Sequence, residues 1–314
     1  MRIAFAGTPD FAVPALKALL NSSHTVVGVL TQPDRPKGRG RQIAASPVKE
    51  TALAHGLPIS QPHTLKDEAG RADLASWQPD VLIVVAYGLI LPRAALTLPR
   101  LGCLNIHASL LPRWRGAAPI QRAVLAGDPV SGVTIMLMDA GLDTGPMLLK
   151  KEVPIARADS GGSLHDRLAA LGASAVLEAL DGYSQGTLTP MPQPTEGVTY
   201  AAKIEKAEAL IDWSRDSLDI ERQVRAFDPW PVAETRLDGE QLRVYEAISE
   251  EGGGAGGQEG GTVVAVRDDA VVVQCGSGRL ALRKVQRPGR RAVSAADFAR
   301  GGAGSSQLVG KRLG

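Results

Sequence analysis

Residues 2–20 read RIAFAGTPDFAVPALKALL, a strand-like run joined by a tight turn to a helix-like one. Arg2–Ala6 is a short apolar run typical of a buried strand, and the turn Gly7-Thr8-Pro9-Asp10 follows it. In that turn Thr8 or Asp10 can cap a helix, with Pro9 near its first turn. A strand, a turn and a helix in this order predict the first unit of an α/β fold. The apolar residues beyond the turn recur at helical spacing, at Phe11, Val13, Leu16, Leu19 and Leu20.

Strand and helix signals keep alternating through the first half of the chain. Alternating units of this kind place parallel strands side by side, with helices on both faces of the sheet. We therefore predict a Rossmann-like, mostly parallel sheet domain over residues 1–189. Its further strands are expected at Thr25–Thr31, Asp80–Ala86, Cys103–His107 and Gly132–Met138, and its helices at about 48–55, 65–76, 117–126 and 163–180.

The pattern changes after residue 180. Residues 190–206 are expected to form an extended linker, because Gly186–Thr199 contains three prolines and several threonines. Beyond it, residues 207–314 show one amphipathic helix at Ser217–Phe227 and then short β runs with turn signals between them, which indicate a small β-barrel. The predicted strands are Pro231–Leu237, Leu242–Ile248, Gly261–Val266, Ala270–Cys275 and Leu280–Val285.

Length and composition exclude several classes of protein. The chain has 314 residues, enough for two domains that each have a core of their own. Its 44% hydrophobic and 22% charged residues exclude full disorder and a collagen-like fibre. No apolar run approaches the roughly 18 residues that a membrane-spanning helix needs. Because no apolar signal region is visible and two cysteines cannot build a disulfide framework, we expect a cytoplasmic protein.

Positive charge is concentrated in two parts of a chain whose net charge is +2. Residues 33–49 carry five Lys or Arg against one acid, and residues 267–314 carry ten against three. Residues 203–266 have the opposite balance, with seven Lys or Arg against fourteen acids. Basic patches on a nearly neutral protein suggest contact with a polyanion at chosen places, although an ordinary solvated surface is an alternative.

The residues LGCLNIHASLLPRWRG, 101–116, bring two reactive side chains to the end of a predicted strand. Asn105 and His107 are two residues apart, so they share one face of that strand. They emerge at its carboxyl end, where open α/β sheets bind ligands. Two donors that converge on one carbonyl oxygen would stabilise an oxyanion there.

Asp143 is the third candidate catalytic residue. It lies in DAGLDTG, 139–145, directly after the predicted strand Gly132–Met138. A carboxylate in this loop can orient the imidazole of His107 and raise its basicity. The alternative is that Asn105 and His107 cap a turn and that Asp143 belongs to an Asx-turn. No third soft ligand accompanies Cys103 and His107, so no metal site is predicted. The first turn contains a single glycine, Gly7, so a nicotinamide or flavin enzyme is not expected.

Two loops carry candidate binding residues. Ser109, Leu110, Leu111 and Pro112 follow the Asn105/His107 strand and can line an apolar slot for a flat ring, with Tyr87 and Gly88 bringing main chain to the same slot. Plain loop packing would explain the same residues. Pro33–Pro47 shows neither a helical nor a strand period, and loops of this length are usually functional or disordered. Its Arg39 and Arg41 can pair with phosphates.

Five stretches of the chain resemble the methionyl-tRNA formyltransferase family, over about residues 1–290. The motif N-x-H-x-S-L-L-P with a downstream D-T-G marks the wider formyltetrahydrofolate-dependent group, and PRWRGAAPIQ with the basic loop points to its tRNA member. The Gly-rich residues 250–261 and the tail after Asp297 depart from the pattern. The stretches are FAGTPDF (5–11), TQPDRPKGRG (31–40), VVAYGLILP (84–92), NIHASLLPRWRGAAPIQ (105–121) and GVTIMLMDAGLDTG (132–145).

The resemblance implies transfer of the formyl group of 10-formyltetrahydrofolate to the α-amino group of methionyl initiator tRNA, as part of translation initiation. It implies Asn105, His107 and Asp143 as catalytic residues, and it implies an OB-like barrel in residues 207–314 that contacts the tRNA. It further implies a cytoplasmic enzyme, and we expect a monomer with no metal. Folate would be held by Tyr87, Gly88, Ser109, Leu110, Leu111 and Pro112, and the acceptor end of the tRNA by Arg39 and Arg41.

Three other readings are kept open by the residues themselves. A formyltransferase acting on a small amine, such as a glycinamide ribonucleotide or a sugar nucleotide, would share Asn105, His107 and Asp143. A hydrolase releasing formate could use them with water as the acceptor. A non-catalytic RNA-binding protein would have no use for them, and would bind without turnover.

Overall fold

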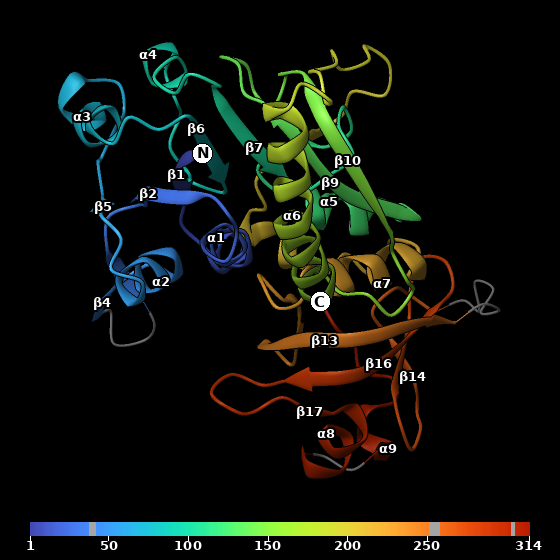
Figure 1. Ribbon diagram of the computed structural model, residues 1–314. Coiled ribbons are helices and arrows are strands. Elements are labelled where there is room, and N and C mark those ends of the chain that lie inside the picture. The colour runs from blue at the N-terminus through green and yellow to red at the C-terminus, as the bar shows by residue number, and fades with distance from the viewer. Residues whose placement is uncertain (38–41, 251–257, 303–304) are drawn as a thin grey trace. The chain divides into compact units, whose positions relative to one another are not determined.

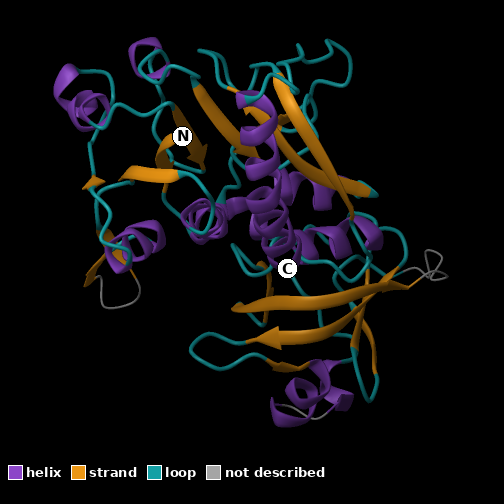
Figure 2. Ribbon diagram, viewed as in Figure 1, coloured by secondary structure: helices purple, strands orange, loops and turns teal. Residues whose placement is uncertain are grey.

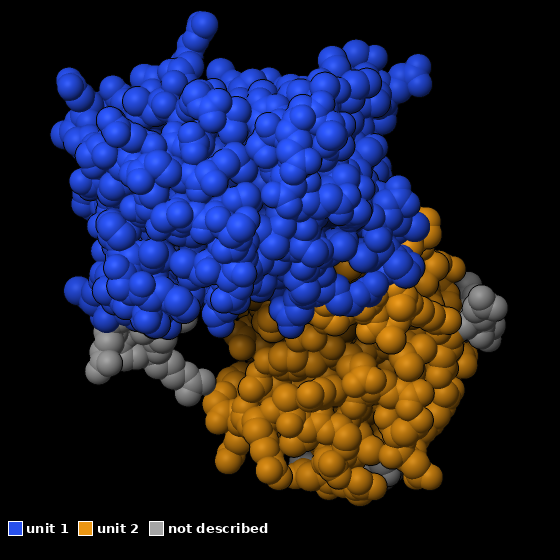
Figure 3. All heavy atoms as spheres, viewed as in Figure 1, with its two compact units in different colours: residues 1–119, 130–154, 165–201 blue, residues 120–129, 155–164, 202–314 orange. Residues whose placement is uncertain are grey.

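The structure, a computed structural model, describes residues 1–37, 42–250, 258–302 and 305–314. The described residues divide into two compact units, coloured separately in Figure 3. The first unit comprises Met1–Pro119, Val130–Pro154 and His165–Ala201, and the second comprises Ile120–Pro129, Ile155–Leu164 and Ala202–Gly314. The first unit thus includes most of the segment between the two predicted domains, and the second includes two short segments from within the first half.

The first unit is built on a mostly parallel sheet, as predicted. Among the described residues the sheet has seven strands in the order β10-β9-β7-β6-β1-β2-β5 (Figures 1 and 2). The five strands from β7 to β5 are parallel, while β9 runs antiparallel to β7 and β10 runs antiparallel to β9. The bounds are β1 Arg2–Gly7, β2 Thr25–Leu30, β5 Ile59–Ser60, β6 Val81–Val85, β7 Cys103–His107, β9 Val130–Leu137 and β10 Met147–Pro154.

Helices cover both faces of this sheet. On one face, Ala4, Ala6 and Leu82 belong to a buried cluster that includes Leu74 of α3. On the other, Gly172 of α6 lies so close to Ile106 of β7 that a Cβ there would stand 2.8 Å from its Cγ2 atom. The described helices in the first 184 residues are α1 Val13–Leu20, α2 Pro47–Ala54, α3 Glu68–Ser76, α4 Arg93–Leu96, α5 Pro119–Ala126 and α6 Gly161–Ser184, of which most of α5 and the start of α6 belong to the second unit.

Neither residue predicted to cap the first helix does so. The short 3-10 turn Asp10–Ala12 precedes α1, and Ala12 stands at the N-cap with no side-chain hydrogen bond. Thr8 instead donates its hydroxyl to the main-chain oxygen of Tyr87, at 2.9 Å. The Thr8 hydroxyl thus binds the loop after β6, the neighbouring strand in the sheet, instead of capping the helix. This bond connects the turn after β1 to the end of β6.

The basic segment 33–47 contains strand structure that its sequence did not predict. Arg35–Lys37 (β3) pairs antiparallel with Gln42–Ala44 (β4), with Arg35 opposite Ala44. Lys49 forms a 2.6 Å ion pair with Asp34, which neutralises part of the positive charge counted there. Arg39 and Arg41, the residues predicted to meet phosphates, lie outside the described residues.

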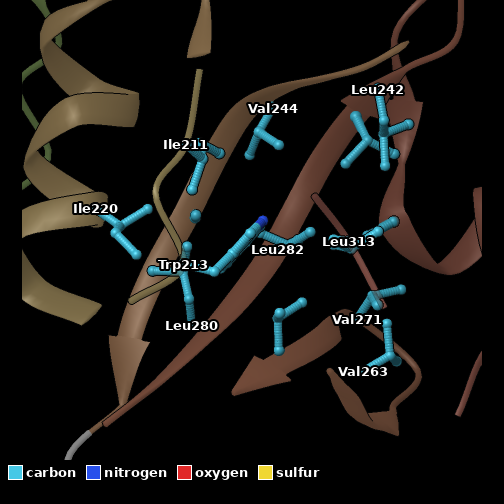
Figure 4. Close-up of a cluster of buried hydrophobic side chains, with 14 of the residues drawn as sticks. Ile211, Trp213, Ile220, Leu242, Val244, Val263, Val271, Leu280, Leu282 and Leu313 are labelled. Carbon is cyan, nitrogen blue, oxygen red and sulfur yellow. The ribbon is translucent and has the colours of Figure 1, made fainter. Parts of the chain in front are cut away.

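The second unit holds an antiparallel sheet with its own core. Within the described ranges this sheet has the order β12-β13-β16-β15-β14, and β17 pairs with β16. Trp213, Val244 and Leu282 are buried in the cluster shown in Figure 4. The Trp213 indole also donates to the Thr235 hydroxyl at 2.9 Å. The bounds are α7 Ser217–Ala226, β12 Ala233–Leu237, β13 Glu240–Glu250, β14 Val263–Val266, β15 Val271–Gln274, β16 Arg279–Gln286, β17 Val293–Ser294, α8 Ala295–Gly302 and α9 Ser305–Leu308.

The last residues of the chain pair with both edges of this second sheet. Leu313 forms an antiparallel bridge with Leu237 of the edge strand β12, and Arg312 forms one with Thr262, next to the other edge strand β14. The Leu313 side chain is buried in the same core. The tail that matched no family pattern therefore has a structural role in joining the two edges.

None of the helices in the described part of the chain is long and apolar enough to cross a membrane.

Candidate active site

Asn105 and His107 lie on one face of β7, the strand between β6 and β9. Asn105 pairs in register with Val84 of β6 and Met136 of β9, and His107 pairs with Thr134 of β9. Because side chains two residues apart on a strand share a face, both belong to the row that ends at the carboxyl edge of the parallel sheet. This is the edge at which open α/β sheets bind their ligands.

The imidazole of His107 is held between a carbonyl and a carboxylate. Its Nε2 atom lies 2.8 Å from the main-chain oxygen of Trp114, and its Nδ1 atom lies 3.7 Å from Oδ2 of Asp143. A carbonyl oxygen can only accept, so Nε2 must carry the hydrogen of this bond. The Nδ1 atom therefore faces the Asp143 carboxylate.

Asp143 reaches His107 from a loop whose backbone is unusual. Its φ is +52°, the left-handed region in which a non-glycine residue costs about 1–2 kcal/mol. Its Oδ2 atom accepts a hydrogen bond from the amide of Gly116 at 2.8 Å. The Asx-turn of this loop belongs to Asp139, whose Oδ1 accepts from the Gly141 amide at 2.9 Å. The Asp143 carboxylate is therefore free of turn bonds and available to His107.

The side chain of Asn105 has hydrogen-bonding capacity that the described residues do not use. Its Oδ1 atom is buried and has no partner among them. A buried polar atom without a partner costs about 1–3 kcal/mol, so such an atom on this strand indicates a group kept for a ligand. The described residues contain no group of three or more His, Cys, Asp or Glu side chains that could hold a metal ion.

The loop after β7 is fixed onto β9 through Thr134. The Thr134 hydroxyl donates to the main-chain oxygen of Ser109 at 2.7 Å and accepts from the amide of Leu111 at 3.1 Å. Ser109 and Leu111 are buried, and Leu111 packs with Met136 and Met147. Their side chains shape the loop, whereas Leu110 and Pro112 are half-buried and keep part of their surface open.

Tyr87 and Gly88 lie where the order of the strands reverses. Strand β2 lies next to β1 on one side, and β6 lies next to β1 on the other. The loops after β1 and β6 therefore flank the point at which the strand order reverses. Tyr87 is 2% exposed, and its ring belongs to a buried hydrophobic cluster. This burial raises the pKa of the Tyr87 hydroxyl. The turn therefore exposes main chain rather than the Tyr87 side chain, and Gly88 has a left-handed φ of +85° there.

Three partners of the candidate catalytic residues could not be read from the sequence. Two are backbone groups, the oxygen of Trp114 and the amide of Gly116. The third is Gln193, which binds the main chain of the Asp143 loop from within the predicted linker. Backbone groups leave no residue signature, and no pattern around Gln193 singles it out.

Two family models match this chain. The model described as formyl transferase covers residues 1–180, and the model of the formyl transferase C-terminal domain covers residues 203–303. The chain is thus a formyl transferase by both of its domains. A methionyl-tRNA formyltransferase of Pseudomonas fluorescens (strain SBW25) is 56% identical over 298 residues, 95% of this chain and 93% of that protein. The chain belongs to the methionyl-tRNA formyltransferase family.

Solved structures share the fold at lower identity. The sugar 3N-formyl transferase WlaRD, crystallised with dTDP and 5-N-formyl-THF, has a TM-score of 0.65 at 18% identity, covering 93% of this chain and 99% of that one. HypX from Aquifex aeolicus in complex with tetrahydrofolic acid has a TM-score of 0.63 at 20% identity, covering 96% of this chain and 48% of that one. These likenesses concern the fold.

Proposed function

We propose that this protein transfers the formyl group of 10-formyltetrahydrofolate to the α-amino group of methionyl initiator tRNA, through Asn105, His107 and Asp143. The observation that carries the assignment of residues is the 3.7 Å approach of His107 Nδ1 and Asp143 Oδ2 at the carboxyl end of β7. The 56% identity to a methionyl-tRNA formyltransferase over 95% of the chain supports the choice of donor and acceptor.

The residues at this edge of the sheet fit a formyl-carrying folate. The buried Asn105 Oδ1 has no partner among the described residues, so it can accept a hydrogen bond from a bound substrate, and the neighbouring His107 adds a second polar group. Leu110 and Pro112 leave partly open apolar surface beside them, as a flat ring requires. Tyr87 and Gly88 bring main chain to the point where the strand order reverses, and Ser109 and Leu111 hold the loop in shape. The folate, when bound, supplies the formyl group.

The chemistry of the three residues follows from the reaction. Attack by a neutral amine places negative charge on the formyl oxygen, and the Asn105 amide and the protonated Nδ1 of His107 can both donate to it. Asp143 stabilises the charged imidazole and keeps Nδ1 turned toward the reacting carbon. The attacking nitrogen forms the new C–N bond and loses its proton through water to the Asp143 carboxylate. The bond between the formyl carbon and N10 then breaks, and N10 takes up a proton by the same route, which releases tetrahydrofolate. The arrangement needs no covalent nucleophile.

We also propose that different parts of the chain have different functions. Residues 1–189 would carry the catalysis, 190–206 would connect, and 207–314 would form an OB-like barrel that contacts the tRNA. The bridges of Arg312 and Leu313 to the two edges of the second sheet support a closed, barrel-like arrangement. The proposal keeps a monomer as its simplest form, and a charged tRNA substrate favours the cytoplasm.

Replacing both Arg39 and Arg41 by alanine is expected to weaken use of the tRNA and leave folate binding intact. Each lost phosphate contact should reduce the log–log dependence of tRNA affinity on salt by about one, so by about two for the double variant. Affinity measured over a salt series checks this, with Arg93→Ala, an exposed arginine on α4, as the control. A double variant with the slope of the wild type would remove the basic loop from the tRNA contact.

The function itself is tested by offering different acceptors to the wild-type protein with a labelled formyl donor. Charged initiator tRNA should be formylated fast, elongator methionyl-tRNA slowly, and free methionine least. Preferential transfer to a glycinamide ribonucleotide or an amino sugar nucleotide would instead place the protein among the small-acceptor enzymes. Release of formate with no formylated acceptor would identify a hydrolase.

A further inference from the structure

Gln193 differs from the residues around it in the segment that follows α6. It is half-buried, while Pro192 and Pro194 on either side are exposed. Its side-chain amide makes contacts in two directions within the first unit. The Nε2 atom donates to the main-chain oxygens of Asp143 and Gly145, at 2.8 Å each. A half-buried polar side chain between exposed prolines, with both ends of its amide bound, has specific partners rather than a merely solvated position.

The other end of the Gln193 amide is fixed by Arg115. Its Oε1 atom accepts from Nε of Arg115 at 3.1 Å and from a terminal nitrogen of the same guanidinium at 2.7 Å. A guanidinium can only donate and two carbonyls can only accept, so the chemistry of the partners sets which end of the amide faces which side. Glutamine is suited to this bridge because its side chain donates two hydrogens and accepts at the other end.

The carbonyls bound by Gln193 flank the strained residue of the site. Asp143 has a φ of +52°, a conformation that persists where its surroundings hold it in place. Gln193 binds the carbonyl of Asp143 itself and that of Gly145, while the Gly116 amide binds the Asp143 carboxylate. Because Arg115 and Gly116 are adjacent, one short segment holds the side chain of Asp143 directly and its main chain through Gln193.

We propose that Gln193 is a positioning residue for the formyl transfer, holding the Asp143 loop in the conformation that places the carboxylate against His107. The inference rests on the proposed catalytic role of Asp143. Gln193 touches neither the imidazole nor a reacting atom, so its effect must pass through Asp143. Removing it should therefore slow the chemical step without changing the affinity for either substrate.

The test compares Gln193→Met, which keeps the length and loses every polar contact, with Gln193→Glu, which keeps the acceptor for Arg115 and loses both donors. Gln185→Met is the matched control, because Gln185 is exposed just beyond the end of α6. We expect kcat to fall about tenfold or more in both Gln193 variants, since small displacements of catalytic groups have effects of that size. The KM values for folate and tRNA should stay within about twofold, and Gln185→Met should match the wild type.

The decisive measurement repeats Gln193→Met in an Asp143→Asn background. If Gln193 acts through Asp143, the two effects on the single-turnover rate are not additive, and the second substitution costs little once the first is present. If Gln193→Met slows the Asp143→Asn enzyme by the same factor as it slows the wild type, the positioning role is overturned and the site assignment stands. A change in KM with an unaltered kcat would do the same. An Asp143→Asn enzyme as fast as the wild type would instead overturn the site assignment and the inference with it.

Discussion

Alanine at Asn105 or at His107 is expected to lower the single-turnover rate of formyl transfer by about 10² or more, because each removes one donor to the developing oxyanion. His107 is the last residue of β7 and Asn105 lies at its middle. The Asn105 oxygen has no partner among the described residues, so little stability depends on it. His107 is held through Trp114 and Asp143, and its loss should affect the loop more than the sheet.

Rapid-quench assays with saturating labelled donor and charged initiator tRNA measure this rate. Asn21→Ala and His63→Ala are matched controls, because both residues are exposed and lie outside the site. Urea unfolding of each variant separates loss of chemistry from loss of fold. Single-turnover rates near the wild-type value for the two site variants would show that β7 does not carry the chemistry.

Replacing Glu221 by alanine is expected to destabilise the second unit by about 3–5 kcal/mol, as the loss of one partner of a buried ion pair does. Glu221 of α7 is 2% exposed. Its carboxylate lies 3.3 Å from Arg157 and 3.7 Å from Arg225, and it accepts from the Ser249 amide at 2.6 Å. Burial lowers the pKa of Arg225, and the Glu221 carboxylate opposes this effect.

Hydrogen exchange of the β13 and β16 amides in urea reports the stability of this unit. Glu240→Ala is the control, since Glu240 begins β13 in an exposed position. Glu221→Gln, which keeps the shape and loses the charge, should lie between the two. A Glu221→Ala variant as stable as the control would show that Arg157, Arg225 and Ser249 find other partners.

Strands with a continuous apolar run were predictable, and strands that depend on their neighbours were not. Val81–Val85, predicted as Asp80–Ala86, is apolar throughout and buried along its whole length. The edge strand Met147–Pro154 was missed because its exposed face carries Lys150 and Glu152, which interrupt the apolar run. The hairpin of β3 and β4 was missed for a similar reason, since each of its strands is three residues long.

Strand periodicity predicted which site residues share a face, but not how the loops bring them together. Asn105 and His107 could be placed on one face because they are two residues apart. The approach of Asp143 to that edge could not be predicted from strand order, because β9 runs antiparallel to β7 and its carboxyl end lies beside the start of β7. The distance from Asp143 to His107 could not be predicted either, because it depends on a left-handed backbone and on the Gly116 amide. Gln193 is 50 residues from Asp143 along the chain, and contacts of that kind come from packing alone.

The most direct test of the proposed chemistry is the single-turnover rate of Asp143→Asn with bound donor and charged initiator tRNA. Asparagine keeps the size of the side chain and can still accept from the Gly116 amide, but it cannot stabilise a charged imidazole 3.7 Å away. We predict a rate lower by about 10² or more, with donor affinity unchanged and a pH dependence that differs from the wild type. A rate close to that of the wild type, with the same pH dependence, would contradict the role of the His107–Asp143 pair.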